Sequence, residues 1–275
     1  MILTAKILKQ ISPNANPNII ATLEQYMDTF FVKYNVNTYM RICHFLAQAA
    51  EESDGFKTLQ EYASGSAYEG RHDLGNTQAG DGVRYKGRGI FEITGRANYK
   101  TYGDKISVDL VNNPQLAADG KNSLLTALEY WNDHGLSIYA DHGDITSITK
   151  KINGGLNGLS VRQEYLNRAL SIIPKDISLS TANIVPSANI VSANTNSVPV
   201  PSITNSILYK KGDSDKSDSS DIEDFQTKLH EKGYAITPDG KFGPLTEAAI
   251  RQFQTANNLE VNGMIDTNTS AKVFF

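Results

Sequence analysis

A segment without charged or aromatic side chains divides this chain and limits what it can fold into. From Ile177 to Ser206 the residues are Ser, Thr, Asn, Ala, Pro and aliphatics, and near-copies of Ala-Asn-Ile-Val follow one another. Such a segment cannot bury a core of its own, and its prolines favour an extended chain. We therefore expect a first domain over 1–173, a flexible Ser/Asn/Pro linker over 174–206 and a second domain over 207–275.

Composition narrows the possible functions. The 275 residues carry a net charge of -4, which argues against a nucleic-acid partner, and the only cysteine is Cys43, so no disulfide can form within the chain. No apolar run reaches the roughly 18 residues that span a membrane. Residues 1–11 are too polar for a secretory signal and predict a short helix stopped before Pro13. We expect a monomer made in the cytoplasm without a signal peptide and released by other machinery.

An apolar helical stripe that ends in a carboxylate is the strongest chemical signal. The stripe consists of Ile42, Phe45, Leu46 and Ala49. Glu52 falls next on it, whereas Glu51 is rotated onto the face of His44 and Gln48, which we expect to point to solvent. A carboxyl held against apolar side chains should have a raised pKa and could act as a general acid. The alternative is a frayed last turn with two solvated glutamates.

A second carboxylate, Glu61, follows nine residues later. Along one helix the two side chains would lie on opposite faces, so they can face each other only if the chain turns. Asp54 and Gly55 are a suitable break. Carboxylates about 6.5 to 9.5 Å apart are what an inverting glycosidase needs, because a water must fit between base and sugar. Two unrelated surface glutamates are the alternative.

A glycine-rich stretch further along the chain suits a sugar ligand. Residues 85–99 mix glycines with Arg, Asn, Tyr and Thr, which together allow close backbone approach and bonds to hydroxyls. A lone Gly-Arg-Gly is more often only a turn. The five histidines form no metal-binding spacing, so we expect no metal and no cofactor.

The order of these motifs resembles glycoside hydrolase family 19, the chitinase-like lysozymes. The matching stretches are Ala47-Gln48, Glu52 to Phe56, Tyr68 to Arg71, Asp73 to Thr77, Gly80 to Gly82, Tyr85 to Tyr99, and Ile152 to Gly158 with Arg162. The resemblance implies a mainly α fold: a lysozyme-like, two-lobed helical catalytic domain with a deep cleft. The chain departs from the family at Glu51, Asp54 and Glu92, where the family commonly has His, Gly and Gln.

Carried over by position, the resemblance makes Glu52 the general acid and Glu61 the base. Thr94 would hold the attacking water. Glu69 is an alternative base, because some members take the second carboxylate from a loop of variable length. The positions expected to bind substrate are Tyr62, Tyr85, Arg88, Glu92, Asn98, Asn153, Gly154 and Arg162.

The second domain contains a degenerate repeat of a turn followed by a helix. Asp239-Gly240 and Asn262-Gly263 begin the two copies. The segment resembles the peptidoglycan-binding domain type 1, a three-helix cell-wall module, and its expected ligand-binding residues are Asp239, Phe242 and Gln254. Together the resemblances imply a bacteriolytic phage endolysin that cuts peptidoglycan glycan strands. A chitinase and a non-catalytic wall-binding protein are the alternatives.

Overall fold

The computed structural model describes residues 2–180, 207–215 and 221–274. Its contacts divide the chain into two compact units: Met1–Trp131 with Ala140–Val200, and Asn132–Tyr139 with Pro201–Phe275. Most of the expected linker, 181–206, lies outside the described residues. Among the described residues, no helix is long and apolar enough to cross a membrane.

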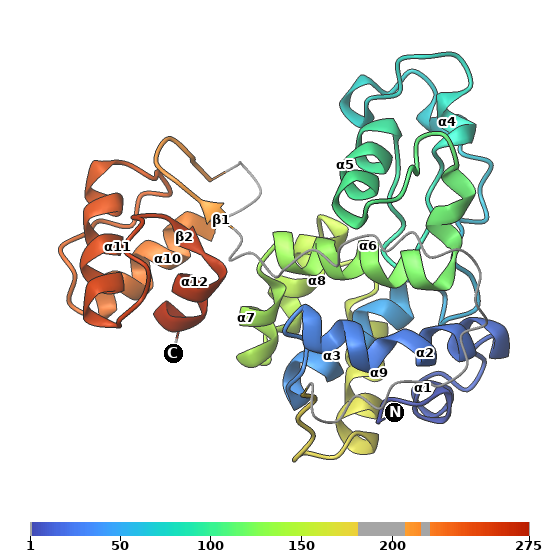
Figure 1. Ribbon diagram of the computed structural model, residues 1–275, viewed down its shortest axis with the longest axis horizontal. Coiled ribbons are helices and arrows are strands. Elements are labelled where there is room, and N and C mark those ends of the chain that lie inside the picture. The colour runs from blue at the N-terminus through green and yellow to red at the C-terminus, as the bar shows by residue number, and fades with distance from the viewer. Residues whose placement is uncertain (1, 181–206, 216–220, 275) are drawn as a thin grey trace. The chain divides into compact units, whose positions relative to one another are not determined.

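Helices and their connections build the first part of the chain (Figure 1). The α-helices are α1 (Ala5–Ile11), α2 (Pro17–Lys33), α3 (Tyr39–Glu52), α4 (Asp81–Arg84), α5 (Arg96–Ile106), α6 (Gly120–Asp133), α7 (Leu136–Asp141), α8 (Ile145–Asn153) and α9 (Leu159–Ile172). Short 3-10 helices cover Ser66–Tyr68, His72–Leu74 and Pro114–Ala118. The helix expected before Pro13 is α1, and the expectation is confirmed.

Capping side chains mark the starts of α1 and α2. The Thr4 side chain accepts a hydrogen bond from the Ile7 amide at the start of α1. The Asn16 side chain does the same for the Asn18 amide at the start of α2, where Pro17 occupies the first turn. Capping of this kind satisfies amides that have no partner within the helix.

The third helix, α3, lies at the centre of the first unit. Every residue from Arg41 to Ala50 is buried, so the expectation that His44 and Gln48 point to solvent is wrong. Helix α9 packs along α3. Phe45 of α3 meets the Trp131 ring of α6 with centroids 5.2 Å apart. A helix enclosed on all sides has no solvent face, whatever its sequence period.

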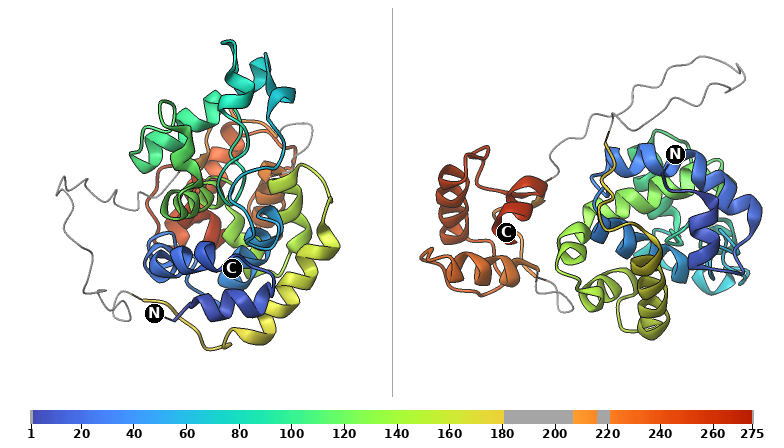
Figure 2. Two further views of the ribbon diagram at one scale, coloured as in Figure 1. Left: turned by 90° about the vertical axis from the view of Figure 1, so that its right-hand side faces the viewer. Right: turned by 90° about the horizontal axis from the view of Figure 1, so that it is seen from below.

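A separate aromatic core holds the region around α4 and α5. The rings of Tyr85 and Tyr99 lie 5.2 Å apart between centroids, and Tyr102 and Leu110 are buried with them. In Figure 1 and in the left view of Figure 2 this region stands apart from α1, α2 and α3. The first unit therefore has two lobes, as expected.

The described start of the expected linker packs on the first unit. Ile177 and Leu179 are buried. The Leu179 amide donates to the Asn37 carbonyl at 3.1 Å, and Ser178 forms an isolated antiparallel bridge with Thr38. Residues 174–180 thus belong to the folded unit rather than to a free tether, because their aliphatic side chains find apolar surface to cover.

The C-terminal module contains the expected three helices, α10 (Asp221–Glu231), α11 (Pro244–Ala256) and α12 (Thr267–Phe274). A short antiparallel pair joins β1 (Ile207–Tyr209) to β2 (Ile265–Asp266), with Tyr209 opposite Ile265. Its core residues are Ile222, Phe225, Leu229, Phe242, Ile250, Phe253 and Ile265. The fold class expected from the sequence is confirmed.

Candidate active site

The central helix ends at Glu52, and the chain then turns sharply. Asp54 and Phe56 have φ values of 49° and 58°, and Gly55 between them has 70°. A Cβ at Gly55 would lie 2.6 Å from the Ser12 hydroxyl oxygen, and that hydroxyl donates to the Gly55 carbonyl at 2.9 Å. Left-handed backbone costs energy in residues other than glycine and is often found at functional sites. The break expected after Glu52 is confirmed.

A buried arginine holds the Glu52 carboxylate. Arg162, in the first turns of α9, is 2% exposed, and its guanidinium donates to Glu52 Oε1 at 2.5 Å and to Gln48 Oε1 at 2.5 Å. The sequence suggested that apolar side chains surround the Glu52 carboxylate. In the structure this carboxylate instead forms an ion pair with the Arg162 guanidinium. Arg162 itself was expected to bind substrate. This is corrected, because its side chain lies inside the protein and acts on Glu52.

The neighbouring carboxylate, Glu51, also departs from its expected position in solvent. A Cβ at Gly158 would lie 2.1 Å from Glu51 Oε1, so the carboxyl packs directly on the start of α9. Burial raises the pKa of the Glu51 carboxyl. The Arg162 cation opposes this rise in pKa, while the charges of Glu52 and Asp54 add to it. Glu51 is therefore a half-buried neighbour of the site.

The second carboxylate, Glu61, is held at both oxygens. Its Oε1 accepts from the Gly87 amide at 2.9 Å, and its Oε2 accepts from the Tyr68 hydroxyl at 2.9 Å. The Glu61 backbone amide donates to the Gly87 carbonyl at 3.0 Å, which fixes the two segments together. A Cβ at Gly87 would lie 3.4 Å from Glu61 Cδ, so the Glu61 carboxylate is within van der Waals distance of this glycine.

A third carboxylate, Glu92, borders the same space. Its φ of 43° is left-handed, and its Cβ would lie 3.4 Å from a Cβ at Gly87, on which Glu61 also packs. Burial raises the pKa of Glu92 to about 7, with the charges of Glu61 and Glu52 adding to the rise and Lys86 opposing it. Because both charges reach Glu92, the three carboxylates share one electrostatic environment.

Thr94 lies next to this group. Its hydroxyl donates to the Glu92 carbonyl at 2.8 Å, and Asn98 at the surface of α5 donates from its side chain to the Thr94 carbonyl at 2.9 Å. Because this hydroxyl donates its proton to the Glu92 carbonyl, the lone pairs of the Thr94 oxygen can accept a hydrogen bond from a further donor. Thr94 and Asn98 are thus joined to the backbone that carries Glu92.

Glu69, the alternative base, has a different environment. Its carboxylate oxygens accept from the Gly80 amide at 2.7 Å and the Gly82 amide at 2.8 Å. A Cβ at Gly82 would lie 2.5 Å from the Glu69 amide nitrogen, so the two segments are in close contact. Glu69 therefore joins two parts of one loop.

The remaining expected substrate contacts separate into exposed and internal residues. Tyr62 is 77% exposed and donates its hydroxyl to Asp54 at 2.9 Å. Asn153 and Gly154 are exposed at the end of α8. Tyr85 is corrected: it is 1% exposed, its ring packs in the aromatic core, and its hydroxyl donates to the Val111 carbonyl at 3.0 Å.

Arg88 also uses its side chain within the protein. The guanidinium donates to the Tyr99 hydroxyl at 2.8 Å, to the Arg84 carbonyl at 2.9 Å and to the Gln60 side chain at 3.2 Å. It joins the segments around Gly87 instead of projecting toward a ligand. The expectation that Arg88 binds substrate is corrected for this reason.

Apart from Arg162, the residues that position the carboxylates were given no role from the sequence. Gln48 lies one helical turn before Glu52, which is a detectable i, i+4 signal. Tyr68 and Gly87 follow Glu61 by 7 and 26 residues in the sequence, and no local pattern indicates that they contact it. Further buried polar atoms, Nδ1 and Nε2 of His44 and Nε of Arg162, have no hydrogen-bond partner among the described residues.

In the C-terminal module, the expected ligand residues serve the fold. Gln254 is fully buried, and its side chain donates to Asn262, Met264 and Thr269 and accepts from the Gly263 amide at 2.9 Å. Phe242 is a core residue. The Asp239 carboxylate accepts hydrogen bonds from the Lys241 amide and from the Gln226 side chain. Phe242 and Gln254 are corrected as ligand contacts because both are buried, whereas Asp239 is exposed and its expected role stays a prediction.

Gln226 repeats the arrangement of Gln254. It accepts from the Asp239 and Gly240 amides at 2.8 and 2.9 Å and donates to the Thr246 hydroxyl at 3.0 Å. In each copy a buried glutamine thus joins an Asx-Gly turn to a threonine of the following helix. The internal repeat expected from the sequence is confirmed as a repeated hydrogen-bond network.

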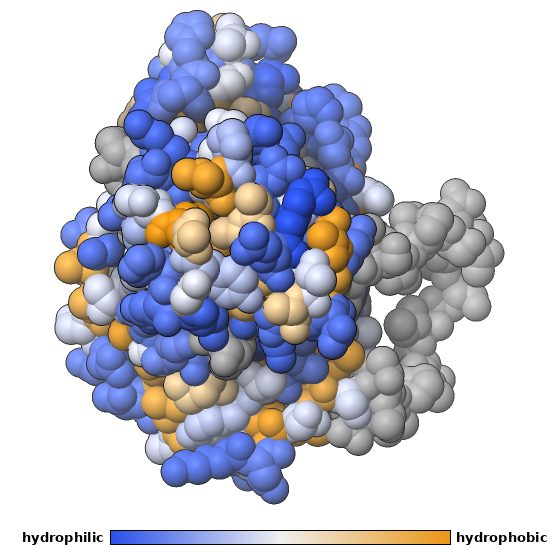
Figure 3. All heavy atoms as spheres, turned by 90° about the vertical axis from the view of Figure 1, so that its left-hand side faces the viewer, coloured by the Kyte–Doolittle hydropathy of each residue, from blue (hydrophilic) through white to orange (hydrophobic). Residues whose placement is uncertain are grey.

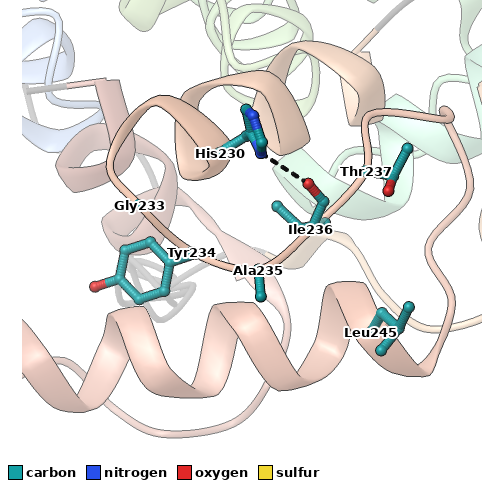
Figure 4. A pocket seen from close by; sticks show the side chains of 7 residues that line it. All are labelled: His230, Gly233, Tyr234, Ala235, Ile236, Thr237 and Leu245. Carbon is teal, nitrogen blue, oxygen red and sulfur yellow. Dashed lines mark hydrogen bonds between the residues drawn. The ribbon is translucent and has the colours of Figure 1, made fainter.

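A surface pocket of about 470 Å³ lies elsewhere on the module (Figure 4). Its lining residues are His230, Gly233, Tyr234, Ala235, Ile236, Thr237 and Leu245. The loop that carries Tyr234 to Thr237 runs between α10 and α11, and His230 Nδ1 lies 3.0 Å from the Ile236 carbonyl oxygen. Sequence reasoning missed this pocket, because its residues carry no shared chemical motif.

Comparison with known proteins identifies relatives of both parts. The family model for chitinase class I, glycoside hydrolase family 19, matches residues 23–148, and that for the peptidoglycan binding domain matches residues 218–273. A glycosyl hydrolase family 19 domain-containing protein of Haemophilus influenzae is 28% identical over 191 residues, covering 58% of this chain and 93% of that protein. The acidic endochitinase of Petunia hybrida is 39% identical over 95 residues, 33% of this chain and 34% of that protein.

Solved structures share the fold. Chitinase C from Streptomyces griseus is 20% identical with a TM-score of 0.53, covering 62% of this chain and 92% of that one. A family 19 class IV chitinase from Zea mays is 18% identical with a TM-score of 0.51, covering 64% of this chain and 97% of that one. At these identities the likeness is one of fold.

Proposed function

Because the chain belongs to glycoside hydrolase family 19 and carries a peptidoglycan-binding domain, we propose that it hydrolyses glycosidic bonds of bacterial peptidoglycan. The reaction is an inverting one that uses two carboxylates. The C-terminal module keeps the enzyme on its insoluble substrate and so raises the local concentration of the catalytic domain. We infer a catalytic domain that extends beyond the expected residue 173 to residue 180, a linker between it and residue 207, and the binding module over 207–275.

Glu52 is the general acid that protonates the leaving glycosidic oxygen. The supporting contact is its ion pair with Arg162, which fixes one carboxylate oxygen and the direction of the side chain. Arg162 is itself held by Gln48, one helical turn before Glu52. A buried guanidinium in this place is a positioning group, because a correctly aimed acid contributes more to the rate than a mobile one.

Glu61 is the base that activates the attacking water. Its carboxylate is aimed by the Gly87 amide and the Tyr68 hydroxyl, and the Thr94 hydroxyl oxygen is free to accept a hydrogen bond from the same water. The observation that carries the proposal is that the charges of Glu52 and Glu61 both raise the pKa of Glu92. An acid and a base that act on one bond must border one space.

Glu61 is favoured over Glu69 as the base. Both oxygens of Glu69 accept bonds from backbone amides of its own loop, which is a structural use of the carboxylate. Only one Glu61 oxygen accepts from a backbone amide, and the other accepts from a tyrosine hydroxyl that can rotate.

Peptidoglycan is favoured over chitin by the binding module, although several relatives are described as endochitinases. A bacteriolytic endolysin, made in the cytoplasm and released to the cell wall by other machinery, is the setting that fits this pair of domains. A wall-binding protein without catalysis is disfavoured by the two carboxylate side chains beside Gly87, Glu61 and Glu92, by the charge of Glu52 that acts on Glu92, and by the intact Thr94.

Product analysis tests the proposed reaction. Purified peptidoglycan is incubated with the full chain and with the Glu52→Gln variant, and the new reducing ends are identified by mass spectrometry after borohydride reduction. We expect reducing sugar ends from the wild type only, with inverted anomeric configuration by NMR at early times. Activity in the Glu52→Gln variant, or a product of retained configuration, would remove the proposed mechanism.

A further inference from the structure

The surface pocket between α10 and α11 has a composition that fits an uncharged sugar polymer. It contains an aromatic ring, Tyr234, and an aliphatic side chain, Leu245, but no lysine, arginine, aspartate or glutamate. Sugars present apolar C–H faces and polar edges, and such ligands are bound by aromatic side chains together with backbone groups. Stem peptides of peptidoglycan carry carboxylates, for which this lining offers no lysine or arginine; its one histidine, His230, has Nδ1 3.0 Å from the Ile236 carbonyl oxygen.

The aromatic side of the pocket has a firm base. The Tyr234 ring stands edge-on to the Phe253 ring with centroids 5.8 Å apart, and Phe253 belongs to the module core. The Tyr234 amide donates to the Leu229 carbonyl at 3.0 Å, which fixes the start of the loop to α10. A ring supported in this way loses little freedom when a ligand stacks on it.

Tyr234 and Leu245 stand at two ends of the lining (Figure 4). Tyr234 packs near Phe253 toward the end of α11, whereas Leu245 stands at the start of this helix and is 71% exposed. Eight residues of helix separate Phe253 from Leu245, which corresponds to about 12 Å. In Figure 4 the loop with Ala235 and Thr237 runs between these two ends. Lining side chains that stand this far apart suit an extended chain better than a single compact group.

Large apolar side chains are sparse on the surface of the module. Among its described residues, the exposed large hydrophobics are Leu245 at 71% and Val261 at 46%. On the face drawn in Figure 3, apolar residues (orange) lie among hydrophilic ones (blue). A protein interface usually buries a broader apolar area, whereas isolated apolar side chains between polar neighbours match the alternating faces of a glycan.

We propose that the pocket lined by Tyr234, Leu245 and the 233–237 loop binds the glycan strand of peptidoglycan, with Tyr234 stacking on a sugar ring. This site deepens the proposed function, since it rests on the wall-binding role of the module. It replaces Phe242 and Gln254 as the contact surface, because these two side chains are buried within the module.

Binding to insoluble cell walls tests the site. The full chain with Glu52→Gln, so that no substrate is consumed, is sedimented with purified sacculi. The pocket changes Tyr234→Ala and Leu245→Ser are added singly and together. The matched control is Val261→Ser, which removes an exposed aliphatic side chain of the module outside the pocket. We expect the double pocket variant to bind at least tenfold more weakly and the control to bind within twofold of its parent.

Competition identifies the part of the wall that is bound. Glycan strands freed of stem peptides by an amidase, with the lactyl carboxylates that this exposes converted to methylamides, should displace the parent from sacculi, whereas isolated stem peptides should not. Tyr234→Phe should keep binding, because it keeps the ring, and circular dichroism checks that the alanine and serine variants are folded. Equal binding by folded pocket variants, or displacement by stem peptides alone, would overturn the proposal. Release of reducing ends from soluble fragments by the wild type tests catalysis separately, so the two failures are distinguishable.

Discussion

Arg162 of α9 and Glu52 of α3 lie 110 residues apart in the sequence and form an ion pair, with 2.5 Å between a guanidinium nitrogen and Glu52 Oε1. The Arg162 side chain is almost completely buried. Gln48 completes the arrangement by accepting from the same guanidinium. The contact turns the carboxylate end of α3 into a fixed group. It also makes the position of Glu52 depend on Arg162, which is itself buried.

Arg162→Ala should therefore reduce both stability and turnover. Removing one member of a buried pair leaves an uncompensated charge, and we expect the free energy of unfolding to fall by about 3 kcal/mol. Arg168→Ala is the control, because Arg168 is an exposed member of the same helix paired with Glu164 at 3.8 Å. Surface pairs of this kind contribute about 0 to 1 kcal/mol. Urea unfolding measures both, and equal effects would contradict the role given to Arg162.

Glu61→Gln and Glu69→Gln should separate the two candidate bases. Loss of a general base costs about 10² to 10⁴ in rate, so we expect that loss in kcat for Glu61→Gln and little change for Glu69→Gln. Turnover of soluble peptidoglycan fragments gives the measurement. The reverse pattern would assign the base to Glu69.

Stability should depend on pH through Glu92. Its pKa rises from 4.5 to about 7 on folding, so the folded protein keeps a proton that the unfolded chain has lost. The unfolded state then binds fewer protons between these values, and the contribution of Glu92 to stability falls as the pH rises from 4.5 to about 7. This penalty is fully present above that range and absent below it.

Glu92→Gln removes that penalty. We expect the variant to gain about 1 to 2 kcal/mol in unfolding free energy at pH 8 relative to pH 4, after allowing for solvent screening of a half-exposed carboxyl. Glu164→Gln, which changes an exposed carboxylate of α9, is the control and should show no such difference. Urea unfolding at both pH values is the measurement. A wild-type curve parallel to that of Glu92→Gln would show that Glu92 does not titrate in this way.

Gln226→Leu and Gln254→Leu should destabilise the C-terminal module to a similar extent. Each substitution leaves buried turn amides without an acceptor, which costs about 1 to 3 kcal/mol. The controls are exposed residues of the same helices, Glu223→Gln for α10 and Gln252→Leu for α11. Thermal unfolding followed by far-ultraviolet circular dichroism measures the loss of stability. A large effect at one glutamine only would show that the two copies are not equivalent in energy.

Local patterns were sufficient for several elements. The stripe from Ile42 to Ala49 predicted α3, and Asp54-Gly55 predicted the turn that follows it, because helix period and left-handed backbone depend on neighbouring residues. The Asp239-Gly240 and Asn262-Gly263 turns predicted the repeat for the same reason. Each of these features is determined by contacts within one or two helical turns.

Directions and long-range partners could not be obtained in that way. The period of α3 distinguishes one face from another but does not say whether a second layer covers the polar face, and α9 does so around His44 and Gln48. Tyr85 has the composition of a sugar-binding residue, yet its ring enters a core built with Tyr99. Residue type fixes what a side chain can bond to, and packing fixes what it does bond to.

Local spacing and backbone preference are enough to predict several helices and turns and to identify the candidate carboxylates. The contacts that hold these carboxylates are visible only in the folded protein: Arg162 binds Glu52, and Gly87 and Tyr68 bind Glu61. The fold also brings Glu92 close enough for the charges of Glu52 and Glu61 to raise its pKa. Such contacts join segments far apart in the chain. They form only once the core is packed, and no local sequence pattern specifies that packing.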